Sequence, residues 1–145
     1  MKIIKKLTVL IFLILAGIIS ADAQCKNFVK KSCMPKLSPF IPSGQMNTTT
    51  MLPGDHAELA LTFYSGQSYR ILVCYQEILG QVQFKLRDAN NNILFNSKDQ
   101  DNADFWDFNV ESTQQLTVEV NVPAVTTENE IVPSGCVSII VAFKK

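Results

Sequence analysis

The amino-acid sequence predicts an all-β protein: an antiparallel β-sandwich of about seven or eight strands, preceded by a short N-terminal helix. Short segments in which apolar and polar residues alternate recur at roughly ten-residue spacing along the chain. Turn-forming residues, mainly glycine, proline, asparagine and aspartate, lie between these segments. The apolar faces of the alternating segments would supply the core of a single sandwich domain.

The first expected strands follow one another closely. Residues 47–52 are β-prone but polar, which is typical of an edge strand. Residues 57–63 then place every second side chain on one apolar face. A turn at Ser65-Gly66-Gln67 leads into a further strand at residues 69–75.

The second half of the chain repeats the pattern. Residues 81–87 show the clearest alternation, and the asparagine-rich segment after Asp88 is suited to a hairpin loop. Residues 136–143 are apolar on both faces, which indicates a central strand. The strands expected in this half are 81–87, 93–95, 106–110, 116–122 and 136–143.

Residues 1–23 have the organisation of a secretory signal peptide. A lysine-rich start is followed by an apolar run that ends in Ala21-Asp22-Ala23, so we expect cleavage between Ala23 and Gln24. The run of about 14 apolar residues is shorter than the roughly 20 that span a bilayer, which disfavours an uncleaved anchor. The polar residues before Cys25 disfavour its lipidation. We therefore expect a secreted or periplasmic protein without a membrane span after cleavage.

Cleavage would leave two segments and a slightly acidic chain. Residues 24–45 would form the N-terminal helix and a proline-rich crossover, and residues 46–145 the β-sandwich domain. The chain has 13 basic and 13 acidic residues, of which cleavage removes three lysines and one aspartate, leaving a formal charge of −2. Because no basic stripe remains, nucleic-acid binding is disfavoured.

The mature chain retains all four cysteines, Cys25, Cys33, Cys74 and Cys136. An even number in an exported protein predicts two disulfides, and the absence of short Cys-x-x-Cys spacing argues against a zinc site.

The pairing depends on residues 26–37. If they form a helix, Cys25 and Cys33 lie two turns and about 12 Å apart, too far for a mutual bond. Each would then bond Cys74 or Cys136. If they form a loop, Cys25–Cys33 and Cys74–Cys136 become the bridges. The lack of a helix breaker before Pro35 favours the helix.

A series of short motifs carries a resemblance to known families. The motifs are Leu59-x-Leu-x-Phe, Gly66-Gln67-x-Tyr69-Arg70-Ile71, Val82-x-Phe84-x-Leu86-x-Asp88, Ile93-Leu94-Phe95 and Trp106-Asp107-Phe108. Together they resemble the jelly roll of GOLD domains and of bacterial pre-peptidase C-terminal domains, over about residues 55–143. This resemblance implies a non-catalytic accessory or cargo-binding module. The signal peptide and the richness in lysine and asparagine are similar to those of secreted proteins of Bacteroidetes.

Four aromatic residues are candidates for a binding platform for sugar or peptide: Tyr64, Tyr75, Phe105 and Trp106. Phe105 is the most informative, because Trp106 belongs to the apolar face of its strand and Phe105 must point the other way. Packing of this second face beneath the N-terminal helix, with Phe105 buried there, is favoured over the platform.

Two further groups offer polar chemistry. Asp99, Asp101 and Asp104 offer hard oxygen ligands at loop spacing, as calcium prefers, but the glycine and terminal glutamate of an EF-hand are missing. A solvated hairpin tip is therefore favoured, and a calcium site is the alternative. His56, the single histidine, lies beside Asp55 and Glu58 and could act as a general base, but a solvated turn histidine is favoured because no nucleophile motif accompanies it.

These observations together predict a secreted, non-catalytic β-sandwich with a binding or envelope-accessory role and a protein or glycan partner. No cofactor is expected, and calcium is the one for which the sequence offers ligands. The alternative function is a calcium-assisted carbohydrate-binding module, and a small hydrolase using His56 is the third.

Overall fold

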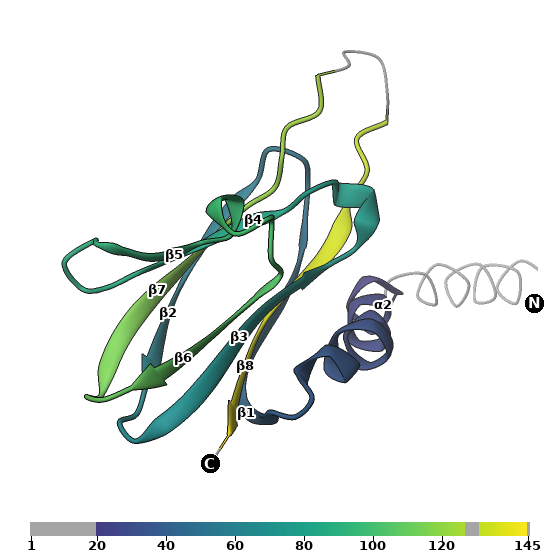
Figure 1. Cartoon of the computed structure of the whole chain (residues 1–145). Coiled ribbons are helices and arrows are strands. Elements are labelled where there is room, and N and C mark those ends of the chain that lie inside the picture. Colours follow the sequence, from purple (N-terminus) through teal and green to yellow (C-terminus); the bar gives the residue numbers. More distant parts are fainter. Residues whose placement is uncertain (1–19, 127–130, 145) are drawn as a thin grey trace, which may run out of the picture.

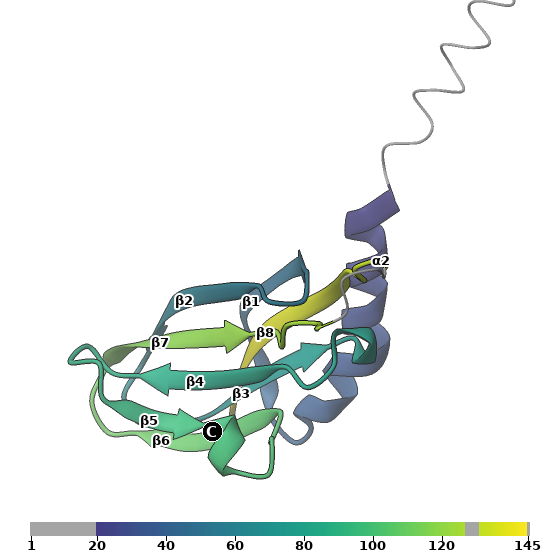
Figure 2. The same cartoon turned by 90° about the horizontal axis from the view of Figure 1, so that it is seen from above.

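The computed structural model describes residues 20–126 and 131–144. The predicted signal peptide therefore lies almost entirely outside the described residues. Two antiparallel sheets of four strands pack face to face, in the orders β1-β8-β3-β6 and β2-β7-β4-β5 (Figures 1 and 2). This confirms the predicted all-β sandwich with its short N-terminal helix. In the described part of the chain, no helix is long and apolar enough to cross a membrane.

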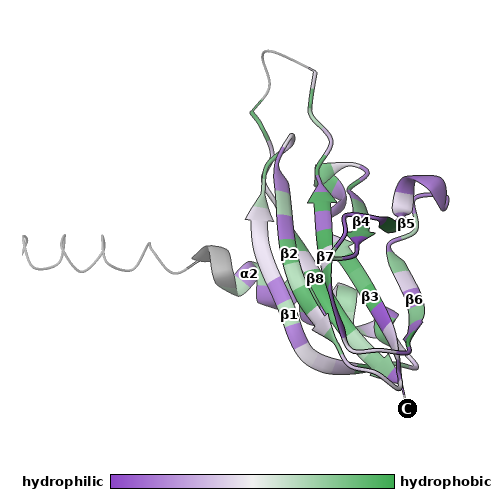
Figure 3. Ribbon diagram, turned by 90° about the vertical axis from the view of Figure 1, so that its left-hand side faces the viewer, coloured by the Kyte–Doolittle hydropathy of each residue, from purple (hydrophilic) through white to green (hydrophobic). Residues whose placement is uncertain are grey.

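Each sheet has two central and two edge strands. The first sheet contains β1 (Ile41–Met51), β8 (Gly135–Lys144), β3 (Gln67–Tyr75) and β6 (Phe105–Val110). The second contains β2 (His56–Phe63), β7 (Gln114–Asn121), β4 (Gln83–Arg87) and β5 (Ile93–Asn96). As its apolar character predicts, β8 is central and is buried over most of its length. In Figure 3, β8 and β3 are largely apolar, whereas the edge strand β1 is pale or polar.

Strand β1 begins earlier than expected. The segment 41–45, which the prolines and Gly44 assigned to the crossover, belongs to the strand. Pro42 is tolerated there because β1 is an edge strand with hydrogen bonds on one side only. A register shift between Pro42 and Met46 accommodates Gly44, which has a φ of 88°. Local composition does not reveal this bulge.

The core between the sheets contains a chain of stacked aromatic rings. Phe84 packs on Phe95 at 5.0 Å between ring centroids, and Phe95 packs on Trp106 at 5.4 Å. Trp106 then stacks on Phe108 at 4.4 Å, and Phe108 meets Phe63 edge-on at 5.2 Å. These contacts join β4 and β5 of one sheet to β6 of the other and fix how the sheets pack at this side.

The N-terminal segment covers the outer face of the first sheet. It consists of α2 (Ser20–Phe28), a π-helical turn η1 (Val29–Cys33) and a 3₁₀ turn η2 (Met34–Leu37). The predicted helix is therefore present, but it begins before residue 26 and tightens around Pro35. Its apolar residues form a second core with β3 and β8, made of Val29, Cys33, Leu37, Leu72, Cys74, Ile140 and Ala142. This cover explains why β8 and β3 are apolar on both faces.

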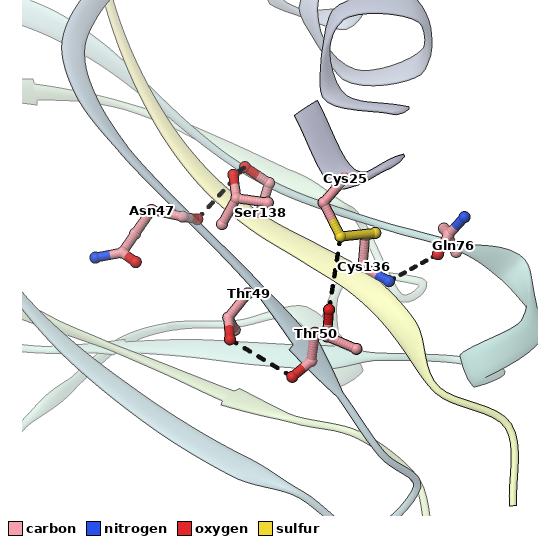
Figure 4. The surroundings of a disulfide bond; sticks show 8 residues. Cys25, Asn47, Thr49, Thr50, Gln76, Cys136 and Ser138 are labelled. Carbon is pink, nitrogen blue, oxygen red and sulfur yellow. Dashed lines mark hydrogen bonds between the residues drawn. A yellow bond between two sulfur atoms is a disulfide. The ribbon is translucent and has the colours of Figure 1, made fainter. Parts of the chain in front are cut away.

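Two disulfides fasten this segment to the first sheet. Cys25 bonds Cys136 with a Cα–Cα distance of 5.5 Å (Figure 4), and Cys33 bonds Cys74 at 5.7 Å. Of the two pairings that the sequence left open, the structure has the one expected for a helical N-terminal segment. Cys25 and Cys33 each bond a cysteine of the sheet and not each other.

Candidate functional site

The structure does not bring the four aromatic candidates onto one surface. Phe105 and Trp106 lie on opposite faces of β6, as strand geometry requires. Tyr75 ends β3, while Tyr64 follows β2 at the opposite end of β3. Tyr64 is exposed, and its backbone N–H donates to the Tyr69 hydroxyl at 3.1 Å. An extended aromatic platform made of all four residues is therefore not formed.

Phe105 belongs to a clamp around Arg70. The Arg70 guanidinium lies between the rings of Phe105 and Phe40, 4.3 and 4.6 Å from their centroids. It donates twice to the Asp107 carboxylate, both at 2.7 Å, which is the main cause of the raised pKa of Arg70. It also donates to the carbonyl oxygens of Lys36 and Ser38, at 3.0 and 3.3 Å. Arg70 thus connects Phe105 to the N-terminal segment. This arrangement resembles the packing beneath the N-terminal helix that the sequence analysis considered for Phe105.

Trp106 is half-buried within the aromatic stack. Phe95 stacks on it with an interplanar angle of 22°, and Phe108 stacks on it at 14°. Trp106 also lines a cleft of about 380 Å³ beside β5, together with the polar side chains of Asn96, Asp99 and Gln100. Because two neighbouring rings already stack on Trp106, it contributes to the wall of this cleft and not to an exposed aromatic platform.

The acidic loop separates its carboxylates. The Asp99 carboxylate accepts a hydrogen bond from the Asn96 amide at 2.8 Å, and Asp104 pairs with the Lys36 ammonium at 2.6 Å. Asp101 takes a left-handed backbone conformation with a φ of 50°. Within residues 20–126 and 131–144, no three acidic, histidine or cysteine side chains form a group that could hold a metal ion. Calcium binding by this loop stays a prediction.

His56 lies in a polar network on the outer face of the second sheet. Its Nδ1 is 2.9 Å from Asn121 Oδ1, and its Nε2 is 3.5 Å from Glu58 Oε1. Arg87 donates to Glu58 at 2.6 Å and approaches Glu119 at 3.0 Å. A hydrogen bond from Asn121 is the largest cause of the lowered pKa of Glu119. His56 therefore contacts an amide and a carboxylate on an open sheet face, and no hydroxyl or thiol of the described residues hydrogen-bonds to it.

Exposed apolar side chains gather at one end of the sandwich, which the sequence analysis did not single out. We call this region the loop end; it consists of the described connections 52–55, 76–82, 122–126 and 131–134 (Figure 1). Its exposed apolar residues are Leu52, Ile78, Val125, Ile131 and Val132. Ile78 and Ile131 are the most open, at 61% and 97% exposure. The sequence does contain a signal for these exposed residues: branched apolar side chains lie within connections that also contain proline or glycine.

The loop end has a rigid base. Gln76 and Cys136 join its two sides, because the Cys136 N–H donates to Gln76 Oε1 at 2.8 Å and the Gln76 N–H donates to the Cys136 carbonyl at 3.0 Å (Figure 4). The disulfide to Cys25 ties the same point to α2. Gly135 packs so closely that a Cβ there would lie 2.7 Å from Leu79 Cγ. The base beneath Ile78 is therefore held by covalent, polar and packing contacts.

Comparison with known proteins shows the fold but no family. No protein-family model matches the chain, and no curated protein matches it, so neither GOLD nor pre-peptidase C-terminal membership is supported beyond the shared sandwich architecture. Among solved structures, the chain is similar to PliG of Aeromonas hydrophila, a periplasmic lysozyme inhibitor of g-type lysozyme. The TM-score is 0.50 at 10% identity, with 69% of this chain and 85% of PliG covered. A de novo designed double-stranded β-helix also matches at 10% identity, covering 69% of this chain and 99% of the design, but its TM-score of 0.31 is too low to carry an argument. The comparison with PliG shows a shared β-sandwich fold.

Proposed function

We propose that the mature protein is secreted, non-catalytic, and acts by binding a protein partner through the loop end. The observation that carries this proposal is that five exposed apolar side chains lie on the connections at one end of the sandwich: Leu52, Ile78, Val125, Ile131 and Val132. Several exposed apolar side chains in one region of a surface are typical of protein-binding sites.

The rigid base of the loop end supports the same proposal. Binding orders side chains and loops, and this ordering opposes association. The Gln76–Cys136 hydrogen bonds and the Cys25–Cys136 disulfide order the base of the loop end before any partner arrives. A partner that buries Ile78 would therefore meet a surface that is already in place.

The fold comparison suggests which partner to test first. PliG is an inhibitor of g-type lysozyme, and this chain shares its fold. A loop end that projects from the sandwich is complementary to a concave surface such as the cleft of an enzyme. An inhibitor of a cell-wall-degrading enzyme would also work in the compartment to which the predicted signal peptide leads.

The proposal is tested by titrating the purified mature protein against g-type lysozyme, with peptidoglycan hydrolysis and calorimetric binding as the two measurements. We expect inhibition that Ile78→Ser and Ile131→Ser weaken at least about tenfold, since burying an isoleucine side chain contributes about 1.5–3 kcal/mol. Ile93→Ser is the matched control, because Ile93 is 58% exposed on β5, outside the loop end. Binding that all three variants weaken equally would contradict the assignment to the loop end. Absence of binding would exclude this lysozyme as the partner.

Glycan binding is the second candidate function. It is favoured by the cleft of about 380 Å³ beside β5, where Asn96, Asp99 and Gln100 can hydrogen-bond to hydroxyl groups. In the described residues, Trp106 Nε1 makes no hydrogen bond and is not one of the buried polar atoms. Calorimetry with a glycan panel, with and without calcium chloride, tests both the cleft and the acidic loop. Heat that Gln100→Ala abolishes would support this function, and no heat with any glycan would eliminate it.

A further inference from the structure

Strand β2 presents an unpaired edge. It bonds only β7 and forms one side of the second sheet, next to β1 of the first sheet (Figure 2). The Val122 N–H donates to the Asp55 carbonyl, so odd-numbered residues of this strand face β7. The Thr62 carbonyl instead accepts from the Gln45 side chain of β1, at 3.2 Å. The backbone groups of Glu58 and Ala60 therefore face away from β7, and no hydrogen bond occupies them among the described residues.

Beside this edge the sandwich is open to its core. Two adjoining pockets of about 90 and 220 Å³ lie between β1 and β2, and both are lined by Leu59 and Ile139. The smaller extends to Ala57 and the larger to Leu61, so the pockets follow one another along β2. Leu59 and Leu61 point into the core but remain only half-buried. At this edge the two sheets thus leave apolar surface uncovered.

We infer that an extended segment of a protein partner adds to β2, with its main chain bonded to Glu58 and Ala60 and alternate side chains in the two pockets. Every second side chain of an added strand points inward. The two pockets are arranged along β2 with the same two-residue spacing, because one is lined by Ala57 and Leu59 and the other by Leu59 and Leu61. Main-chain bonds supply affinity in such strand addition, and pockets for alternate side chains supply specificity. Gln45, which already bonds the Thr62 carbonyl, takes the place of one donor of the missing strand.

Charge on the outer face of β2 selects the residues between the apolar ones. Glu58 lies directly opposite Glu119 of β7, and the lysine and arginine that pair with these carboxylates both come from β4: Arg87 bridges the two, and Lys85 lies 3.7 Å from Glu119. On its own strand Glu58 has the His56 ring at 3.5 Å. No lysine or arginine of the described residues pairs with Glu58 from its open side, so a basic residue of an added strand would form an ion pair with it there. The Glu58 side chain is 48% exposed and can receive it. The partner segment therefore alternates apolar residues with at least one lysine or arginine.

A second copy of this chain as the occupant, and two of the three other edge strands as the site, fit less well. In a second copy of this chain, the inward side chains of β2 belong to its own core and cannot enter these pockets. Strand β1 carries Pro42 and a bulge, and β5 has only four residues. The inferred site is also separate from the loop end and goes beyond the function proposed above.

The test uses a short peptide that alternates valine and lysine, titrated into the mature protein by calorimetry. We expect it to bind about five- to tenfold more tightly than the same peptide with glutamate in place of lysine. A peptide of the same composition with its valines grouped together is the control for charge alone. In hydrogen exchange, the amides of Glu58 and Ala60 exchange quickly in the free protein and become protected in the complex. Equal binding of all three peptides, or protection of β6 in place of β2, would overturn the inference.

Variants on β2 make the test specific. Ala60→Pro removes an N–H that faces away from β7, so the sheet should tolerate it while peptide affinity falls about tenfold or more. Ala60→Ser keeps this N–H and is the matched control. Should Ala60→Pro fail to fold, Glu58→Lys serves instead, since it should reverse the preference toward the glutamate peptide. Unchanged preference in Glu58→Lys would also refute the inference. Ile78→Ser leaves peptide binding intact, which separates this site from the loop end.

Discussion

Replacing Arg70 with methionine tests how the N-terminal segment is held on the sheet. The variant keeps an apolar side chain of similar length but loses the guanidinium and all its hydrogen bonds. Since Asp107 is 40% exposed, the ion pair contributes only about 1 kcal/mol. The bonds to the Lys36 and Ser38 carbonyls and the contacts with Phe40 and Phe105 each add about 0.5–1 kcal/mol. We expect the free energy of unfolding to fall by about 3–5 kcal/mol.

The assay combines urea unfolding with hydrogen exchange. The loss in stability should be accompanied by faster exchange in residues 36–40, because the two disulfides still hold the segment before Leu37. Arg70→Lys should recover less than half of the loss, since an ammonium group cannot form the planar double bond to Asp107. Arg87→Met is the control on the other sheet and should leave residues 36–40 unchanged. A loss below about 1 kcal/mol with unaltered exchange at 36–40 would refute the reasoning.

The remaining predictions concern the bridges, the loop end and acid stability. Replacing both Cys33 and Cys74 with alanine should cost about 4 kcal/mol of unfolding free energy from the sequence separation of 41 alone, measured by urea unfolding; an unchanged midpoint would contradict the chain-entropy account. Gly135→Ala should lower the melting temperature, because its Cβ would lie 2.7 Å from Leu79 Cγ; a wild-type melting curve would show that Leu79 can move away. Glu119 has a lowered pKa, so its contribution to stability is present above its ordinary value of 4.5 and is lost as the pH falls below it. Glu119→Gln should therefore be less stable than wild type at neutral pH but nearly equal to it at pH values well below 4.5; a constant difference would contradict this role.

The strands were predictable because the signal that specifies them is local. Alternation of apolar and polar residues placed all eight strands near their observed positions, and the apolar character of residues 136–143 predicted the central place of β8. The bulge in β1 was not predictable, because Pro42 and Gly44 are tolerated there only through the edge position of the strand. Which of the candidate site residues lie together was not predictable from the sequence. Whether Phe105 is free depends on Arg70, which is 35 positions away in the sequence.

The sequence by itself determined the alternating strands and the number of disulfides. These follow from the period of the apolar residues and from the count of cysteines, which need no knowledge of distant neighbours. Only the tertiary structure decided that Cys25 and Cys33 bond Cys136 and Cys74, that Phe95 and Phe108 stack on Trp106, and that β2 has an open edge beside apolar pockets. Each of these depends on which strands lie side by side, and strand order is set by packing over the whole chain and not by any local pattern.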